Sequence, residues 1–280
     1  MIKSSYHLFT VFGIPVKADI SLIFLAIILV SQNDSPLYGL VAGLVLLISV
    51  LLHELGHSLV AMAFGCRVKD ITLMMIGGCA SMLSMPRKAW QEFLMALAGP
   101  LVSLALALLA FAVIYTPLGR LLGTTPFTAF ALEYLMYLNA VLFVFNLLPA
   151  FPMDGGRILR AFLQQFFMTK VKATWIASRI GRIVAVFMAI SVVYSWATGR
   201  FEGFMFIRLL IAFVIFRAAE QEYQMVLAQE GYGNGNPFAR FGFPFFGRTT
   251  RTPPPDDGQA IVSPPPYDHG GSKRVDVHKE

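Results

Sequence analysis

The sequence has few charged residues. Asp, Glu, Lys and Arg make up 14% of its 280 residues, whereas a soluble globular domain carries about a quarter. Hydrophobic residues reach 56%, and the mean hydropathy is +0.66. This composition excludes an ordinary soluble domain and predicts an integral membrane protein surrounded by a lipid bilayer.

Cysteine is almost absent as well. Cys66 and Cys79 are the only two and form no C-x-x-C pair, which argues against a disulfide framework or a cysteine zinc site. No small-residue cleavage site follows the first apolar run, so a removable signal peptide is not predicted. The net charge of +6 comes without a basic block interleaved with aromatics, so no nucleic-acid partner is predicted. Lys and Arg are instead expected in cytoplasmic loops.

Long apolar runs dominate the rest of the chain. Because about 20 apolar residues cross a bilayer, they predict an all-α polytopic membrane protein with about six transmembrane helices. Between the second and third helices, residues 71–82 are expected to form two short strands around a Gly77-Gly78 turn, as a small re-entrant segment. The expected helices cover residues 18–31, 37–64, 93–115, 127–148, 175–196 and 203–216.

Composition divides the chain into three parts. Residues 1–17 are expected to be a cytoplasmic segment bent along the membrane surface, and residues 18–217 the membrane-embedded domain. Residues 218–280 are rich in Pro and Gly and too poor in apolar residues to fold, which predicts a disordered cytoplasmic tail. Basic residues gather on the side of the N-terminus, so both termini are predicted to be cytoplasmic. We expect a multi-pass protein of a bacterial cytoplasmic membrane.

The second apolar run contains the motif H-E-x-x-H, as His53, Glu54 and His57. On a helix the two histidines lie one turn apart on the same face, so both imidazoles can reach one metal ion, with the glutamate beside them. A chance match would usually lie on a solvated surface helix. Here the flanks are apolar, and an ionisable residue inside such a run costs about 2.5–3.5 kcal/mol to insert, which favours a functional role.

A third ligand is expected from Asp154, in the stretch PMDGGR after the fourth apolar run. If the N-terminus is cytoplasmic, the second and fourth helices both run inward, so Asp154 emerges at the depth of His53 and His57. The alternative is that Asp154 caps the helix that follows. Two His and one carboxylate suit catalytic zinc, with iron(II) as the rival metal. An adjacent glutamate favours zinc and hydrolysis.

Four pieces of the sequence resemble the site-2 protease family of intramembrane zinc metalloproteases. They are HELGH at 53–57, Gly-Gly at 77–78, LAGPLVS at 97–103 and NLLPAFPMDGGR at 146–157. The resemblance implies one Zn²⁺ per chain bound by His53, His57 and Asp154, with Glu54 as the catalytic base. It also implicates Asn146 in binding substrate or steadying the oxyanion. Capping the end of the fourth helix is the alternative role for Asn146.

We therefore interpret the chain as an intramembrane zinc metalloendopeptidase that cleaves transmembrane segments near the cytoplasmic side, in regulated intramembrane proteolysis. The strand-like segment at 71–82 would pair with an extended substrate, and Gly77 and Gly78 would allow its close approach. A loop that only packs is the alternative there. A metal or solute transporter is less favoured, because the ionisable residues cluster at one depth. A proteolytically inactive substrate-binding protein is the remaining alternative.

Overall fold

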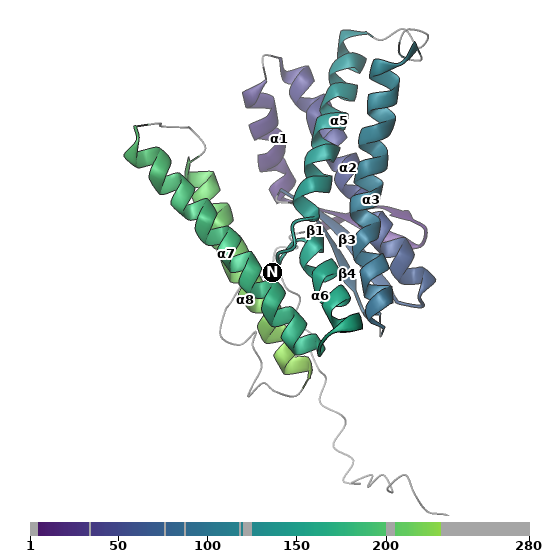
Figure 1. Cartoon of the computed structure of the whole chain (residues 1–280). Coiled ribbons are helices and arrows are strands. Elements are labelled where there is room, and N and C mark those ends of the chain that lie inside the picture. Colours follow the sequence, from purple (N-terminus) through teal and green to yellow (C-terminus); the bar gives the residue numbers. More distant parts are fainter. Residues whose placement is uncertain are drawn as a thin grey trace, which may run out of the picture. The chain divides into compact units, whose positions relative to one another are not determined.

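The computed structural model describes residues 5–33, 35–75, 77–86, 88–117, 119, 125–199 and 205–230. These residues form a mostly helical structure with one small sheet (Figure 1). Its elements in chain order are β1 (Ser5–Val11), β2 (Ile14–Asp19), α1 (Ser21–Gln32), α2 (Pro36–Ala63), β3 (Val68–Met74), β4 (Gly77–Met82), α3 (Ala89–Tyr115), α5 (Pro126–Asn146), α6 (Asp154–Phe166), α7 (Lys170–Ala197) and α8 (Met205–Gln229).

Four of these helices are long and apolar enough to cross a membrane: α2, α3, α5 and α7. They confirm the second to fifth expected spans. Helix α1 has 12 residues, about 18 Å at 1.5 Å per residue, which is short of a hydrocarbon core of about 30 Å. The expected number of six is therefore not confirmed within the described ranges. Helix α8 runs to Gln229, past the expected domain boundary at residue 217, and the predicted disorder of residues 231–280 lies outside the described residues.

The ends of the long helix α2 follow from its sequence. Ser35 caps its first turn by accepting a hydrogen bond from the Leu37 amide, and Pro36 occupies the first position, where no amide hydrogen is needed. At the other end Gly65 has φ +80°, a left-handed conformation that glycine adopts freely. The amide of Cys66 then donates to the Ala61 carbonyl at 3.0 Å and closes the helix.

The sheet is larger than expected, and the all-α prediction is wrong in this respect. Its strand order is β1-β2-β3-β4, with β2 and β3 parallel and the outer pairs antiparallel. Residues 5–19, expected as a bent surface segment, form a hairpin. Phe12 and Gly13 both have positive φ at its turn, as two-residue hairpins require. The first four residues of β2 alternate between buried and half-buried, which is the two-residue period of a strand. The alternation is too short to stand out in the sequence.

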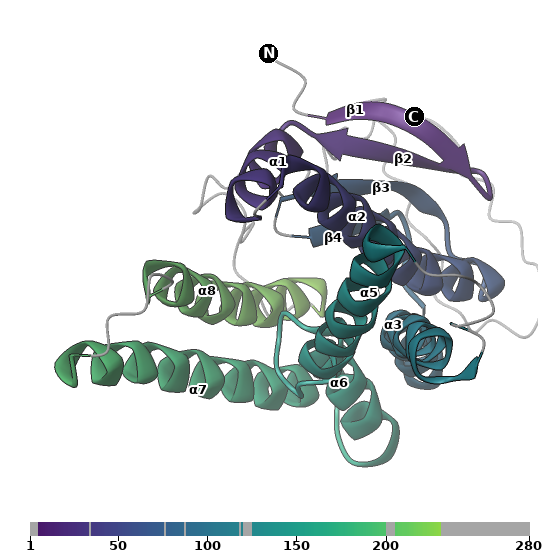
Figure 2. The same ribbon diagram turned by 90° about the horizontal axis from the view of Figure 1, so that it is seen from above.

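The two strands expected at 71–82 are confirmed as β3 and β4, but the turn is misplaced. Met75 lies in the turn, whereas Gly77 and Gly78 are the first residues of β4. The buried side of the sheet packs on α2, as Figure 2 shows from above. The shared apolar cluster consists of Ile14, Val16, Val50, Leu55, Ile71 and Leu73. This packing places the sheet against the helix that carries the two histidines.

Candidate metal centre

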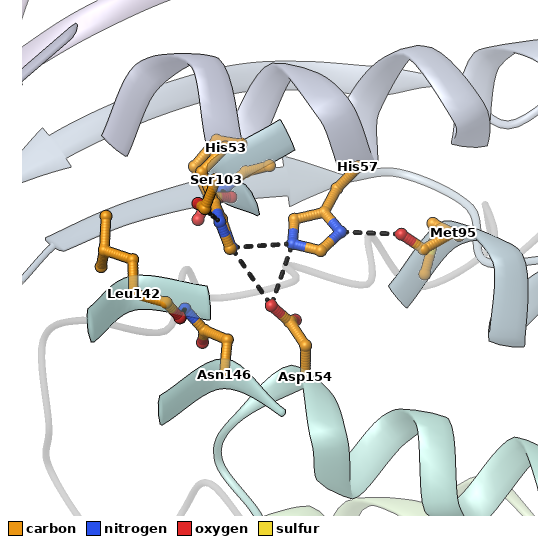
Figure 3. Close-up of polar contacts among 9 residues, drawn as sticks. His53, His57, Met95, Ser103, Leu142, Asn146 and Asp154 are labelled. Carbon is orange, nitrogen blue, oxygen red and sulfur yellow. Dashed lines mark hydrogen bonds and ion pairs between the residues drawn. The ribbon is translucent and has the colours of Figure 1, made fainter. Parts of the chain in front are cut away.

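His53 and His57 lie on one face of α2, as their spacing predicts. Both residues are buried, with 6% and 7% of their surface exposed. Their rings are nearly perpendicular, with centroids 4.9 Å apart, and their Nε2 atoms are 3.2 Å apart. The helix thus directs two imidazole nitrogens at one point (Figure 3).

Asp154 reaches the same point from a distant part of the chain. Its Oδ2 atom lies 3.2 Å from His53 Nε2 and 3.1 Å from His57 Nε2. Asp154 is the first residue of α6 and not its N-cap, which is Met153, and no side-chain capping bond is formed there. The alternative role as a helix cap is therefore wrong. The carboxylate faces the imidazoles and not the amides of its own helix.

The three ligand-type atoms fit a small tetrahedral cation. Their separations of 3.1, 3.2 and 3.2 Å form a nearly equilateral triangle. A tetrahedral zinc ion with bonds of 2.0–2.1 Å needs ligand–ligand edges of about 3.3 Å. Among the described residues, one group of three or more His, Cys, Asp or Glu side chains has the spacing of metal ligands. This group is His53, His57 and Asp154. Three protein ligands are the number found in catalytic zinc sites, where water or substrate takes the fourth position.

Hydrogen bonds on the far side of each imidazole orient the rings. His57 Nδ1 lies 2.7 Å from the Met95 carbonyl oxygen, which can only accept, so Nδ1 carries the proton and Nε2 keeps its lone pair for a metal. His53 Nδ1 lies 2.9 Å from the hydroxyl of Ser103. Helix α3 therefore sets the direction of both ligands.

Asp154 is held in its ionised form. Burial alone would raise the pKa of its carboxyl, but contact with His53 and His57, together with the charge of Arg157, holds that pKa well below its usual range. The Nε2 atoms of His53 and His57 lie 3.2 and 3.1 Å from Asp154 Oδ2, so these atoms can share a proton or a metal ion.

Gly99 makes room for the imidazoles. A Cβ atom at this position would lie 2.2 Å from His57 Nε2 and 2.8 Å from His53 Nε2, far inside contact distance. Gly99 and Ser103 belong to the LAGPLVS stretch of the family resemblance, but the sequence predicts no contact with the metal ligands for them or for Met95. They lie at four-residue spacing on one face of α3, and this spacing together with the polar Ser103 was the signal that could have identified them.

Glu54 lies next to the ligands and contacts β4. The half-buried Glu54 side chain accepts a hydrogen bond from the Ala80 amide through Oε2, at 3.2 Å. Gly78 permits this approach, because a Cβ atom there would lie 2.7 Å from Glu54 Cγ. The structure thus brings Gly78 to the candidate site, whereas Gly77, at φ +138°, has open space around it.

Asn146 is the last residue of α5, and the chain continues from it into the loop that carries Asp154 (Figure 3). Its side-chain amide donates to the Leu142 carbonyl of its own helix at 2.9 Å. This bond is local to the helix and is no cap, because the Leu142 carbonyl is not among the last four carbonyls of α5. The loop then packs tightly on the start of α6, since Cβ atoms at Gly155 and Gly156 would lie 2.1 Å from the Leu148 oxygen and 2.6 Å from the Phe151 nitrogen.

Comparisons with known proteins agree with this geometry. A curated relative, a zinc metalloprotease of Methanocaldococcus jannaschii, is 34% identical over 82% of this chain and 64% of its own length. Stage IV sporulation protein FB of Bacillus subtilis is 32% identical over 43% of this chain and 41% of its own. The chain thus spans less than two thirds of the length of these relatives.

A solved structure is also similar. The site-2 protease from Methanocaldococcus jannaschii matches with a TM-score of 0.54 and 32% identity, covering 78% of this chain and 95% of that one. The sequence profile of peptidase family M50 matches residues 41–131 and 123–188, which together make up more than half of the 280 residues. With its fold, its motifs and its histidine–aspartate triangle in agreement, the chain belongs to peptidase family M50.

Proposed function

We propose that this chain is an intramembrane zinc metalloendopeptidase that cleaves transmembrane segments of membrane proteins near the cytoplasmic side. The observation that carries the proposal is the triangle of His53 Nε2, His57 Nε2 and Asp154 Oδ2, with edges of 3.1–3.2 Å. The two histidines of this triangle lie on α2, a helix apolar enough to span a membrane. These three residues would hold one Zn²⁺ per chain. Relatives named as zinc metalloproteases support the choice of metal.

When bound, the metal would act as a Lewis acid that lowers the pKa of the attacking water and polarises the substrate carbonyl. Glu54 is the general base: its carboxylate removes a proton from the attacking water as the new C–O bond forms. It then delivers that proton to the leaving amine as the C–N bond breaks. The bond from the Ala80 amide orients the carboxylate beside the histidines. A fixed base of this kind contributes about 10²–10⁴-fold to the rate.

The substrate would bind along β4. This strand is the last of the sheet order, and its Ala80 amide donates to Glu54. An extended substrate could add to such an edge, with Gly77 and Gly78 allowing its backbone to come close. Asn146 is retained as a second proposed substrate contact, because its side-chain amide has another hydrogen besides the one donated to Leu142.

The proposed location is a bacterial cytoplasmic membrane, with both termini in the cytoplasm. Helices α1 and α8 would complete six crossings together with the four long apolar helices. Because α1 reaches only about 18 Å, its crossing depends on a locally thinned bilayer. This orientation places the metal centre toward the cytoplasm, and regulated intramembrane proteolysis is the corresponding physiological role.

Glu54→Gln tests the proposal. The full-length protein is reconstituted with a single-span substrate, and cleavage and bound zinc are measured together. Cleavage should fall at least about 10²-fold while zinc stays bound, because the amide cannot take the proton but removes no ligand. Glu133→Gln, at an exposed acid on α5, is the matched control and should cleave normally. Cleavage by Glu54→Gln at the normal rate would refute the assigned base.

A further inference from the structure

A buried cluster of charged side chains surrounds Arg160 of α6, the helix that begins with Asp154. The Arg160 side chain donates through Nε to Glu92 Oε1 of α3 at 2.9 Å, and its second contact with Glu92 is shorter. A third bond runs from Arg160 to Glu222 Oε1 of α8 at 2.7 Å. Arg160 and Glu92 are 2% and 6% exposed, so this ion cluster lies in the interior.

Arg160 also contacts the loop that presents Asp154. Its guanidinium carbon lies 5.0 Å from the centroid of the Phe151 ring, within the range of a cation–π contact. Phe151 is 1% exposed and packs with Ala177 of α7 and Ala219 of α8. Phe151 precedes Asp154 by three residues, in the loop before α6. The Arg160 side chain, which belongs to α6, therefore links this helix to the loop that leads to Asp154.

A second arginine, Arg157, lies one turn before Arg160 on α6. Burial lowers the pKa of its guanidinium, but the charges of Glu222, Asp154 and Glu92 outweigh burial and raise it. Arg160 is the member of this cluster that is bonded to both Glu92 and Glu222. Removing one member of a buried ion pair leaves its partner uncompensated, and the surrounding helices must then move or admit water. Any such movement of α6 displaces Asp154.

We infer that Arg160 is a positioning residue for the metal centre: by joining Glu92, Glu222 and Phe151, it holds Asp154 at the imidazole pair and makes α8 part of the support of the site. The inference rests on the proposed zinc site. The planar guanidinium is required because it bonds two carboxylates from two helices at once, which a lysine ammonium cannot do with the same geometry. Because Glu222 bonds Arg160, a displacement of α8 would move Arg160 and therefore Asp154.

The test compares Arg160→Lys and Glu222→Gln with the intact protein. Zinc affinity of the full-length protein is measured by competition with a chelator, and the visible spectrum of the cobalt(II)-substituted protein reports the ligand geometry. Arg160→Lys should weaken zinc binding about 10-fold, at the lower end of the range for residues that support metal ligands, and should alter the cobalt spectrum. Glu222→Gln should change both in the same direction by a smaller factor.

The matched control is Arg179→Met. Arg179 is exposed on α7 and lies over the Trp175 ring of the same helix, so its removal deletes an exposed charge and a cation–π contact within α7. Zinc affinity and the cobalt spectrum should not change. If Arg160→Lys and Glu222→Gln lower the melting temperature while both metal readouts match the intact protein, the cluster only stabilises the fold and the inference is overturned. If Asp154→Asn itself binds zinc normally, the proposed site is wrong, and the inference falls with it.

Discussion

Replacing Gly99 by alanine should weaken zinc binding by this protein without unfolding it. The added Cβ would lie 2.2 Å from His57 Nε2, 2.5 Å from His57 Cε1 and 2.8 Å from His53 Nε2. Carbon and nitrogen atoms in ordinary contact are about 3.5 Å apart, so the overlap with His57 exceeds 1 Å. His57 cannot retreat easily, because its Nδ1 is bonded to the Met95 carbonyl at 2.7 Å.

The size of the effect follows from overpacking. Forcing a methyl group into a filled site costs about 1–3 kcal/mol, and each 1.4 kcal/mol is tenfold in an equilibrium constant. If the imidazoles move to relieve the overlap, zinc affinity should fall about 10- to 100-fold, and cleavage should fall with it. The α3 backbone itself favours alanine over glycine by up to about 1 kcal/mol, so helix formation is not impaired.

The assay is zinc binding of the purified protein, measured by chelator competition, together with cleavage of a single-span substrate. Gly43→Ala is the control, because its Cβ would meet Leu29 Cδ1 at 3.6 Å, an ordinary contact, also within a candidate span. It should bind zinc and cleave normally. Normal zinc affinity in Gly99→Ala would show that the imidazoles do not occupy the position from which the zinc site was inferred.

Two further substitutions separate metal binding from catalysis. Ser103→Ala removes the hydroxyl 2.9 Å from His53 Nδ1 and should weaken zinc binding about 10-fold, measured by chelator competition. The control is Ser191→Ala, at an exposed serine bonded to the Met188 carbonyl of its own helix, which should bind zinc normally. Equal zinc affinities of the two variants would show that the Ser103 contact does not orient His53. Ala80→Pro removes the amide that orients Glu54, so it should lower the rate of cleavage at unchanged zinc content, whereas Ala80→Ser keeps that amide and should cleave normally. A normal rate in Ala80→Pro would leave the bond without a role in placing the base.

Sequence patterns predicted the long helices well but missed part of the sheet. A run of more than 20 apolar residues and a four-residue spacing of histidines are local features, and a helix converts them directly into a membrane span and a two-ligand face. Residues 5–19 were not recognised as strands, because six or seven residues give a weak alternation. The pattern predicts the turn of the next hairpin at Gly77-Gly78, although both residues belong to β4 and Gly78 is needed beside Glu54.

The sequence by itself determined that His53 and His57 share a face and that Glu54 stands beside them, since these relations depend only on helix geometry. Whether Asp154 would cap its helix or approach the imidazoles was decided by tertiary structure, which places its Oδ2 within 3.2 Å of both rings. The same holds for the Met95 carbonyl behind His57 and for the room left by Gly99. Such contacts join segments that a local pattern cannot relate, because the packing of α3 against α2 and of α6 against α3 sets their distances.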